Sequence, residues 1–214
     1  MPEEGFDMKK LALLVSGSGT NMQAIMDACA SGEINGRIAV VISSNHEAYA
    51  LVRAEGAKIP NYVCCKKDYP SAEARDREIL RLLKMYDVDY VILAGYLGIL
   101  PQFVIDAYPN RIVNIHPSLL PKFGGKNFYG IRVHSAVIAA GEKESGATAH
   151  FVAADIDGGP IIRQQKLTVY KGDTPEALQK RILTQIEHPM LVSVIKDLCD
   201  DKIKVVDGKV VVSD

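Results

Sequence analysis

Apolar runs and amphipathic segments alternate along the first half of the chain. Continuous apolar runs predict buried strands at residues 10–15, 37–43, 62–65, 88–93 and 111–115. Between them, apolar residues at helical spacing predict a helix from Met22 to the helix-ending Gly32, helices at 46–54 and 71–85, and a short one opened by Pro101. Strands that are apolar on both faces and alternate with helices are typical of a parallel sheet covered by helices on both faces.

The pattern changes after Pro121, where helices no longer alternate regularly with strands. The segments predicted there are a glycine-rich loop at 123–130, a helix at 134–140, a strand at 148–152, a tight turn at 155–160 and a strand at 161–169. Two strands on either side of a tight turn predict an antiparallel part in the second half of the sheet.

A long helix and a short hairpin complete the chain. The helix is capped by Asp173 or Thr174, has Pro175 in its first turn, and is expected to kink at Pro189. The segment 203–212, centred on an Asp-Gly pair, has the pattern of a hairpin. No repeat or linker divides the sequence, so we expect one α/β domain at 9–214 after a disordered leader at 1–8.

Charge and hydrophobicity narrow the classes of partner. The 25 Lys and Arg residues nearly balance the 26 Asp and Glu residues, for a formal charge of −1. We therefore expect small-molecule partners, with neither nucleic acid nor a membrane among them. Hydrophobic residues, at 48%, suffice for a substantial core, but no apolar run approaches the roughly 20 residues that a membrane span requires.

Cysteine and histidine spacing bears on compartment and metal binding. The four cysteines, Cys29, Cys64, Cys65 and Cys199, form no C-x-x-C pair, and the five histidines show no H-x-x-x-H spacing. This pattern predicts neither a disulfide framework nor a metal site, and it favours the reducing cytoplasm.

The first candidate site is the sequence SGSGTN at residues 16–21, between the first strand and the first helix. A glycine-rich turn aims backbone N–H groups and a helix N-terminus at one point, which suits a phosphate. A dinucleotide site is excluded because Met22 stands where its motif needs a third glycine. A P-loop is excluded because its lysine is missing. A single phosphate-ester site is favoured over a turn without a ligand.

The second candidate site is the pair Asn114 and His116, at the end of the strand that Pro117 terminates. Side chains two apart on a strand point the same way, so an amide donor and a titratable ring share one face. Ligands of open α/β sheets bind at such strand ends. The alternative is a structural histidine capped by a backbone carbonyl, with Asn114 turning the chain.

The third candidate site is DIDGGP, residues 155–160. Glycines and proline account for a turn, and one aspartate would cap it. Asp155 and Asp157 are also a conceivable metal pair, but no third ligand is nearby in the sequence. A carboxylate on this turn would instead orient an imidazole and raise its pKa, which favours the protonated ring. Spacing alone does not bring Asp157 to His116.

Together these segments resemble the small folate-dependent glycinamide ribonucleotide formyltransferases. The resemblance runs in order from about Lys9 to the long helix, and its most specific pieces are SGSGTNMQAI, VILAGYLGIL, NIHPSLLPKF, HFVAADIDGGPII and GDTPEAL. It implies a single-domain Rossmann-like formyltransferase fold, a role in de novo purine biosynthesis, and 10-formyltetrahydrofolate as cosubstrate with no metal. We expect a monomer or a weak homodimer.

The resemblance also implies roles for individual residues. Asn114, His116 and Asp157 fall on the catalytic triad of the family. The positions that match its binding residues are Gly19, Thr20 and Asn21 for the substrate phosphate, Glu187 for the ribonucleotide, and Leu97, Gly98, Ile99, Leu100 and Asn114 for the folate.

Three departures from the family pattern concern the binding residues. Leu97-Gly98 replaces a common Met-Arg pair, so a side-chain contact to the pterin is lost while backbone contacts can remain. An arginine that binds the folate tail in several relatives aligns with Ala72, which leaves Arg75 as a substitute. The loop 123–132 is several residues longer than its commonest form.

The chemistry of these residues fits formyl transfer to an amine. Donors such as the Asn114 amide and protonated His116 stabilise an oxyanion, and a histidine can move the proton that leaves the amine. Other members of the superfamily remain alternatives: methionyl-tRNA formyltransferases, sugar N-formyltransferases and formyltetrahydrofolate hydrolases. So does a non-catalytic module that binds phosphate or nucleotide.

Overall fold

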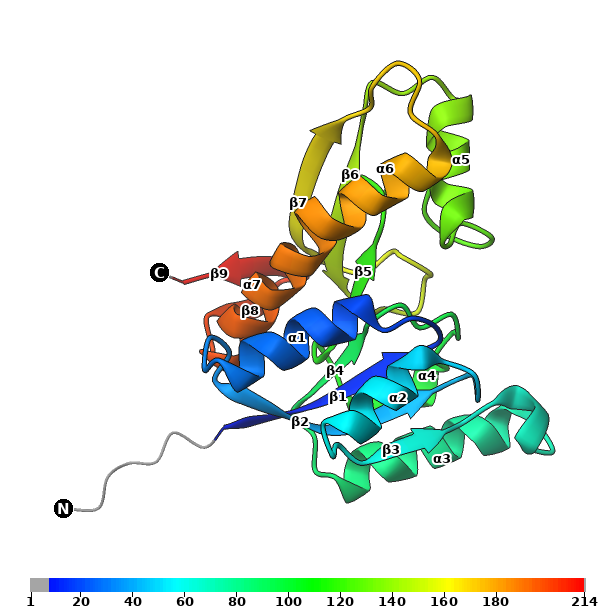
Figure 1. Cartoon of the computed structure of the whole chain (residues 1–214). Coiled ribbons are helices and arrows are strands. Elements are labelled where there is room, and N and C mark those ends of the chain that lie inside the picture. The colour runs from blue at the N-terminus through cyan, green and yellow to red at the C-terminus, as the bar shows by residue number, and fades with distance from the viewer. Residues whose placement is uncertain (1–7, 214) are drawn as a thin grey trace.

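The fold is a seven-stranded sheet with the order β3-β2-β1-β4-β5-β6-β7, shown in Figure 1. The computed structural model describes residues 8–213, so the predicted disordered leader, apart from Met8, lies outside the described residues. The first five strands are parallel, and β6 runs antiparallel to both of its neighbours, β5 and β7. The strands are β1 Lys9–Val15, β2 Gly36–Ser43, β3 Asn61–Val63, β4 Tyr90–Leu93, β5 Ile112–His116, β6 Glu144–Phe151 and β7 Ile161–Thr168. The predicted α/β class with an antiparallel second part is confirmed.

Helices cover both faces of the sheet, because the central strands are apolar on both sides. In β1, Leu11 and Leu13 belong to one core cluster, whereas Ala12 and Leu14 belong to the other. The first cluster packs under α1, α2, α5, α6 and α7, and the second under α3 and α4. The helices are α1 Thr20–Ala30, α2 Tyr49–Gly56, α3 Ala72–Met85, α4 Gln102–Ala107, α5 Ile131–Ala139, α6 Pro175–Ile182 and α7 His188–Cys199.

The strand order reverses at β1, and this fixes where a ligand can bind. The chain runs outward from β1 through β2 to β3, then returns to place β4 on the other side of β1. The loops that leave the carboxyl ends of β1 and β4 therefore diverge and leave a crevice between them. The first two sequence-predicted sites follow β1 and end β5, so they lie at this carboxyl edge. The third follows β6, which runs antiparallel to β5, so its turn must fold back along β5 to reach the other two.

Among the element boundaries that differ from the sequence prediction, two have a clear structural reason. The helix expected from residue 46 begins at Tyr49, because the Asn45 side chain accepts a hydrogen bond from the Glu47 amide at 3.1 Å and holds a turn. Strand β6 begins at Glu144 rather than at 148, because its whole length pairs with β7, from Glu144 opposite Thr168 onward.

The long C-terminal helix is interrupted by a π-helical turn, η2, at Leu183–Glu187. A kink was expected at Pro189, and the irregularity lies in the turn before it. Proline has no N–H to bond the carbonyl four residues earlier, so the preceding turn widens. Thr174 is the N-cap, with its hydroxyl accepting from the Ala177 amide at 3.2 Å. The widened turn brings Glu187 to the sheet side of the helix, where it is buried.

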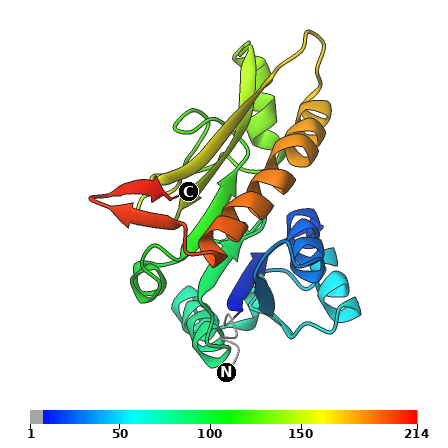
Figure 2. The same cartoon turned by 90° about the vertical axis from the view of Figure 1, so that its left-hand side faces the viewer.

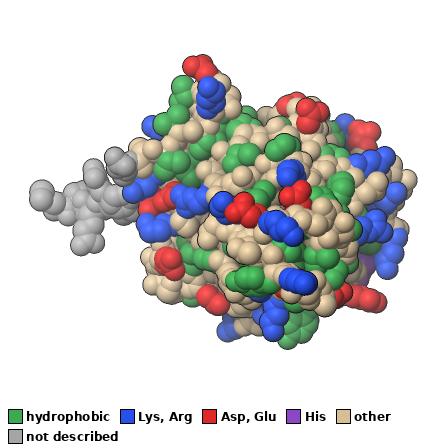
Figure 3. Space-filling model, turned by 90° about the horizontal axis from the view of Figure 1, so that it is seen from above, with side chains coloured by type: hydrophobic (Ala, Val, Ile, Leu, Met, Phe, Trp, Pro, Cys, Tyr) green, Lys and Arg blue, Asp and Glu red, His purple; other side chains and the backbone are tan. Residues whose placement is uncertain are grey.

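The remaining features concern the tail, the thiols and the surface. The predicted hairpin is confirmed as β8 Ile203–Val206 and β9 Lys209–Val212, and it lies beside β7 (Figure 2). All four cysteines are free thiols. Within residues 8–213, no helix combines the length and apolar character that crossing a membrane would demand. Acidic and basic side chains are mixed over the face seen in Figure 3.

Candidate active site

A cleft of about 710 Å³ opens at the carboxyl edge of the parallel strands. Its size is typical of small-molecule sites. It is lined by residues 16–21, 93–100, 114–117, 125–130 and 152–157, together with His134, His150, Gln179, Leu183 and Glu187. All three sites predicted from the sequence therefore open into one cavity, and the segment Leu97–Leu100 lies in the same wall.

Asn114, His116 and Asp157 meet at the floor of this cleft. The Asp157 Oδ2 atom lies 3.4 Å from His116 Nδ1, and Asp157 Oδ1 lies 3.4 Å from the Asn114 Nδ2 that donates to it. Both contacts are longer than an ordinary hydrogen bond of about 2.7–3.2 Å. The same carboxylate therefore faces both the amide and the imidazole, but at long range.

The turn 155–160 aims the Asp157 carboxylate at the sheet. Asp157 itself has a left-handed backbone conformation, with φ at 56°. Gly159 allows the turn to approach β6 closely, because a Cβ at this position would lie 1.8 Å from the Phe151 carbonyl oxygen. The Gly125 amide donates to Asp157 Oδ2 at 2.8 Å and fixes the carboxylate from the opposite side.

The His116 ring is held by the backbone of the loop that follows β5. Its Nε2–H donates to the Phe123 carbonyl at 2.7 Å, so the other nitrogen, Nδ1, is the one that gains or loses a proton. Thr148 on β6 supports this loop, because its hydroxyl donates to the Ser118 carbonyl at 2.7 Å and accepts from the Leu120 amide at 3.1 Å.

The protonation state of the His116 ring differs from the one expected. Burial lowers the pKa of His116 below its ordinary value, and this outweighs the opposing influences of Asp157 and the Phe123 carbonyl, which raise it. Asp157 raises the pKa of the ring as expected, but the net pKa is below the ordinary value, so the expected protonated ring is not the resting state. Only 4% of His116 is exposed. The resting imidazole is neutral and faces a carboxylate that stabilises its charged form.

Asp157 remains ionised although it is largely buried. Burial raises the pKa of its carboxyl, but the neighbouring His150 ring and the Gly125 amide, with a smaller influence of His116, lower this pKa by more. The net pKa of Asp157 is below its ordinary value, so the carboxylate is charged at neutral pH.

His150 belongs to the same network, and the sequence did not reveal it. It lies opposite Asn114 in the antiparallel pairing of β5 with β6. Its Nδ1–H donates to the Phe151 carbonyl at 2.9 Å, so its Nε2 accepts from the Asn114 amide at 3.1 Å. Nε2 also lies 3.6 Å from Asp157 Oδ1. His150 thus fixes which way the Asn114 amide points.

The turn 16–21 leaves the N-terminus of α1 free for an anion. The N-cap residue Gly19 has φ at 72° and supplies no side-chain cap, and the first turn of α1 contains no acidic residue. The first-turn amides have no partner within a helix. Arg53 braces the loop by donating from Nε to the Ser18 carbonyl at 2.9 Å, which adds a positive charge beside it.

Gly19 also permits a close approach of two helices. A Cβ on this residue would lie 2.7 Å from the Ala50 Cβ and 2.9 Å from the Ala50 Cα. Any larger residue would therefore disturb the fold as well as the ligand. Thr20 and Asn21, the other two predicted phosphate-binding residues, begin the helix and line the cleft.

The segment Leu97–Leu100 forms an apolar wall beside this loop. Leu97 and Ile99 are each 63% exposed although both line the cleft, whereas Leu100 is buried. The Leu97 amide donates to the Ser16 hydroxyl at 2.8 Å, so this wall is tied to the phosphate loop. Gly98 packs on the Tyr96 ring, which a Cβ would approach to 2.5 Å, so a side chain here would displace that ring.

Glu187 and Asn21 form a buried polar pair in the cleft wall. Asn21 Nδ2 donates to Glu187 Oε2 at 2.8 Å, while Asn21 Oδ1 is buried without a hydrogen-bond partner. Burial raises the pKa of Glu187 to about 7, although the Asn21 contact lowers it. The pair therefore has acceptor capacity that a hydroxyl-bearing ligand can use.

We expect Glu187→Gln to stabilise the ligand-free protein above pH 7 but not below pH 5. Between the ordinary carboxyl pKa of 4.5 and about 7, the folded protein holds a proton that the unfolded chain has released. Stability therefore falls as pH rises through this window, and glutamine removes that loss, by about 1–3 kcal/mol at pH 8. Urea unfolding at both pH values measures the difference.

The exposed residue Glu55 supplies the matched control for this experiment. Glu55→Gln should give the same unfolding free energy as the unmodified protein at both pH values. An equal effect of Glu187→Gln at pH 5 and pH 8 would contradict the raised pKa.

The structure also places residues for which the sequence left the role open. Arg75 does not line the cleft, and its guanidinium pairs with Asp76 at 2.6 Å. It is therefore a poor substitute for the arginine that binds the folate tail in several relatives. The loop 123–132, which the resemblance led us to expect to be longer than usual, supplies the backbone groups that hold His116 and Asp157. His134 lines the cleft with both ring nitrogens unpartnered, and burial lowers its pKa to about 4, so it is neutral.

Comparison with known proteins identifies a family. Residues 9–195 match the family described as formyl transferase. A phosphoribosylglycinamide formyltransferase from Haemophilus influenzae is 41% identical over 201 residues, which cover 94% of this chain and 92% of that protein.

Solved structures of similar fold agree with this match. The crystal structure of glycinamide ribonucleotide transformylase 1 from Symbiobacterium toebii superposes with a TM-score of 0.91 at 41% identity, covering 99% of this chain and 96% of that chain. A formyltetrahydrofolate deformylase from Pseudomonas syringae also superposes, with a TM-score of 0.87 at 29% identity, covering 97% of this chain and 67% of that chain.

Proposed function

The chain belongs to the formyl transferase family, and we propose that Asn114, His116 and Asp157 carry out its reaction. The reaction is the transfer of the formyl group of 10-formyltetrahydrofolate to the amine of glycinamide ribonucleotide, a step of purine biosynthesis. The observation that carries the assignment of residues is the pair of 3.4 Å contacts from one carboxylate to both an amide and an imidazole.

The ribonucleotide binds beside the loop 16–21, and the folate binds beside the wall Leu97–Leu100. The phosphate of the ribonucleotide binds the free amides at Gly19, Thr20 and Asn21, and its sugar hydroxyls donate to Asn21 Oδ1 and Glu187. The folate ring packs against the apolar wall Leu97–Leu100 and hydrogen-bonds to its backbone. The Leu97–Ser16 hydrogen bond ties the folate wall to the phosphate loop, and the reacting groups meet at the floor between them.

The chemistry begins with attack of the neutral amine on the formyl carbon. A C–N bond forms, and negative charge develops on the formyl oxygen. The Asn114 amide donates one hydrogen to His150 and turns its second, held only at 3.4 Å by Asp157, to this oxygen. A positioned donor of this kind lowers a barrier by about 3–4 kcal/mol.

His116 moves the proton that the amine must lose. Its neutral Nδ1 accepts this proton, directly or through water, and the resulting imidazolium is stabilised by Asp157. The imidazolium then gives the proton to the folate nitrogen as the bond from that nitrogen to the formyl carbon breaks. No covalent bond to the protein forms at any stage.

A turnover assay tests the substrate assignment. The purified protein is incubated with 10-formyltetrahydrofolate alone and with each acceptor: glycinamide ribonucleotide, methionyl-tRNA or an amino sugar nucleotide. We expect formyl transfer to glycinamide ribonucleotide only. Release of formate without an acceptor would favour a hydrolase, and binding of the ribonucleotide without turnover would favour a non-catalytic module.

We expect Thr20→Asp to raise the KM for glycinamide ribonucleotide ~10-fold or more, with the KM for the folate unchanged. An acid in the first turn of a helix is compatible with folding, but its charge repels the phosphate. Steady-state kinetics with each substrate varied in turn measures both constants. Thr20→Ser should match the unmodified enzyme, and an equal rise of both KM values would place the phosphate elsewhere.

A further inference from the structure

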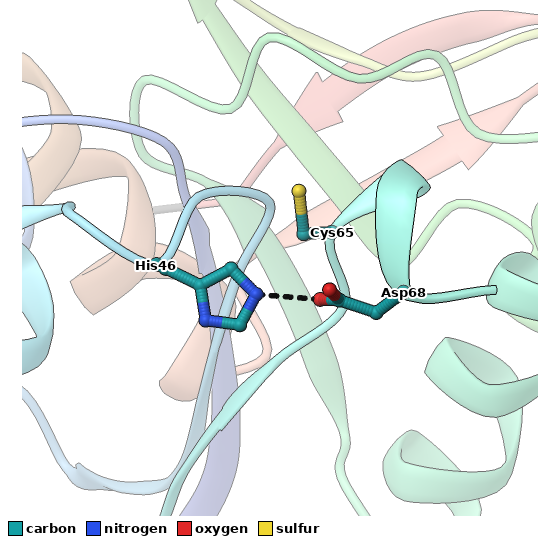
Figure 4. A group of neighbouring side chains, drawn as sticks. All are labelled: His46, Cys65 and Asp68. Atoms are coloured by element: carbon teal, nitrogen blue, oxygen red, sulfur yellow. Dashed lines mark hydrogen bonds and ion pairs between the residues drawn. The ribbon is translucent and has the colours of Figure 1, made fainter.

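Three side chains capable of binding a metal gather outside the cleft. They are His46, in the loop after β2, Cys65, which precedes the short 3₁₀ turn Lys66–Asp68 after β3, and Asp68, which ends that turn (Figure 4). Their candidate ligand atoms all lie within 4.8 Å of one another. His46 Nε2 and Asp68 Oδ2 are 2.6 Å apart.

The backbone explains why these residues meet. Strands β2 and β3 are parallel neighbours, with Ser43 opposite Val63, so the loops that follow them leave the sheet side by side. The Asp68 amide donates to the Cys65 carbonyl at 3.0 Å, which closes one 3₁₀ turn. Cys65 and Asp68 lie at the two ends of this hydrogen-bonded turn and close to His46, with the Cys65 sulfur directed away from the His46–Asp68 contact (Figure 4).

Nitrogen, sulfur and oxygen donors in one group match the chemistry of Zn²⁺. This ion binds imidazole, thiolate and carboxylate in tetrahedral sites, and a water fills a fourth position when the protein gives three ligands. A thiolate and a carboxylate together neutralise the charge of the ion. His46 and Asp68 are exposed and Cys65 is partly buried, so an ion and its water can enter from solvent.

Small side-chain movements would complete the coordination. Tetrahedral bonds of about 2.0–2.3 Å require ligand atoms about 3.3–3.6 Å apart. The imidazole and carboxylate therefore separate by less than an ångström from their 2.6 Å contact, and the Cys65 sulfur turns inward about χ1. Lys66 and Lys67 are exposed beside the cluster and oppose cation binding, whereas the neighbouring Glu47 favours it.

We propose that His46, Cys65 and Asp68 form a Zn²⁺ site that clamps the loops after β2 and β3. Strand β3 has only three residues and lies at the edge of the sheet, where it pairs with β2 alone. A metal bridge between the two loops would hold this short edge strand in place. None of the three residues lines the catalytic cleft, so the ion takes no part in the reaction.

Metal binding to the reduced, full-length protein tests this site. Competition with a chromogenic chelator measures the Zn²⁺ affinity of the unmodified protein and of Cys65→Ser and Asp68→Asn. We expect one Zn²⁺ per chain and an affinity at least ~100-fold lower in each variant. Cys29→Ser, which removes another partly buried thiol, is the matched control and should bind as tightly as the unmodified protein.

Co²⁺ supplies a second readout that does not depend on affinity alone. A cobalt–thiolate bond gives a near-ultraviolet charge-transfer band, which we expect in the unmodified protein and in Cys29→Ser but not in Cys65→Ser. Amide exchange of β3 should also slow when Zn²⁺ is added. Absence of stoichiometric Zn²⁺ binding, or a thiolate band that survives Cys65→Ser, would overturn the proposal.

Discussion

His116→Ala should lower kcat by about 10²–10⁴-fold, which is the usual contribution of a positioned acid–base group. The neutral Nδ1 atom of His116 is a proton acceptor that lies 3.4 Å from the Asp157 carboxylate. Removing the ring leaves the amine proton without this acceptor and leaves the Phe123 carbonyl without its donor. Single-turnover kinetics with both substrates saturating measures the chemical step.

Folding and binding must be measured beside the rate, because His116 is buried and anchors a loop. Circular dichroism and isothermal titration with each substrate should show an intact fold and dissociation constants within a few-fold of the unmodified enzyme. His46→Gln, a histidine outside the cleft, is the matched control and should retain full kcat. A folded His116→Ala protein with near-normal kcat would contradict the mechanism.

The sequence predicted the residues at the bottom of the cleft only where local backbone geometry determines which way a side chain points. Alternation along a strand places Asn114 and His116 on one face, and the structure shows both side chains in the cleft. His150 escaped this reasoning, because its position opposite Asn114 depends on the antiparallel register of β5 and β6. The Phe123 carbonyl and the Gly125 amide escaped it as well, since backbone groups leave no mark in the sequence.

The fold shows the same division between local and long-range information. The apolar runs predicted every strand of the parallel sheet, but the beginning of α2 depended on a turn held by the Asn45 side chain. The π-helical turn that positions Glu187 has a local cause in Pro189, yet the sequence predicted only a kink. The cluster of His46, Cys65 and Asp68 was invisible to motif spacing, because parallel pairing of β2 and β3 assembles it.

Burial decides the protonation of the site, and it does so in opposite directions for its two kinds of group. It keeps His116 neutral at rest by lowering the pKa of the imidazole, whereas it raises the pKa of Glu187 to about 7. Asp157 remains charged only because hydrogen bonds and nearby imidazoles oppose its burial. The carboxylate that stabilises a transient imidazolium is thus kept ionised mainly by His150 and the Gly125 amide.

Asp157→Asn should lower kcat by about 10²-fold or more, because the imidazolium that forms on His116 loses its stabilising charge. Asparagine is nearly isosteric, and its side-chain oxygen can still accept from the Gly125 amide, so the turn and the loop should stay in place. A loss of activity with unchanged thermal stability would therefore show that the reaction needs the negative charge of Asp157, and that the loss does not come from a disturbed fold.

The pH profile separates this role from mere support of the ring. The Asp157 charge raises the pKa of His116, against the larger lowering by burial, so its removal lowers that pKa further. Since the neutral ring is the active form, kcat/KM falls as pH drops through this pKa, and the acid limb should move to lower pH in Asp157→Asn. Asn114→Ala, which removes the oxyanion donor and leaves the carboxylate, should lower kcat and move this limb far less. An acid limb unchanged in Asp157→Asn would show that Asp157 does not act through the charge of His116.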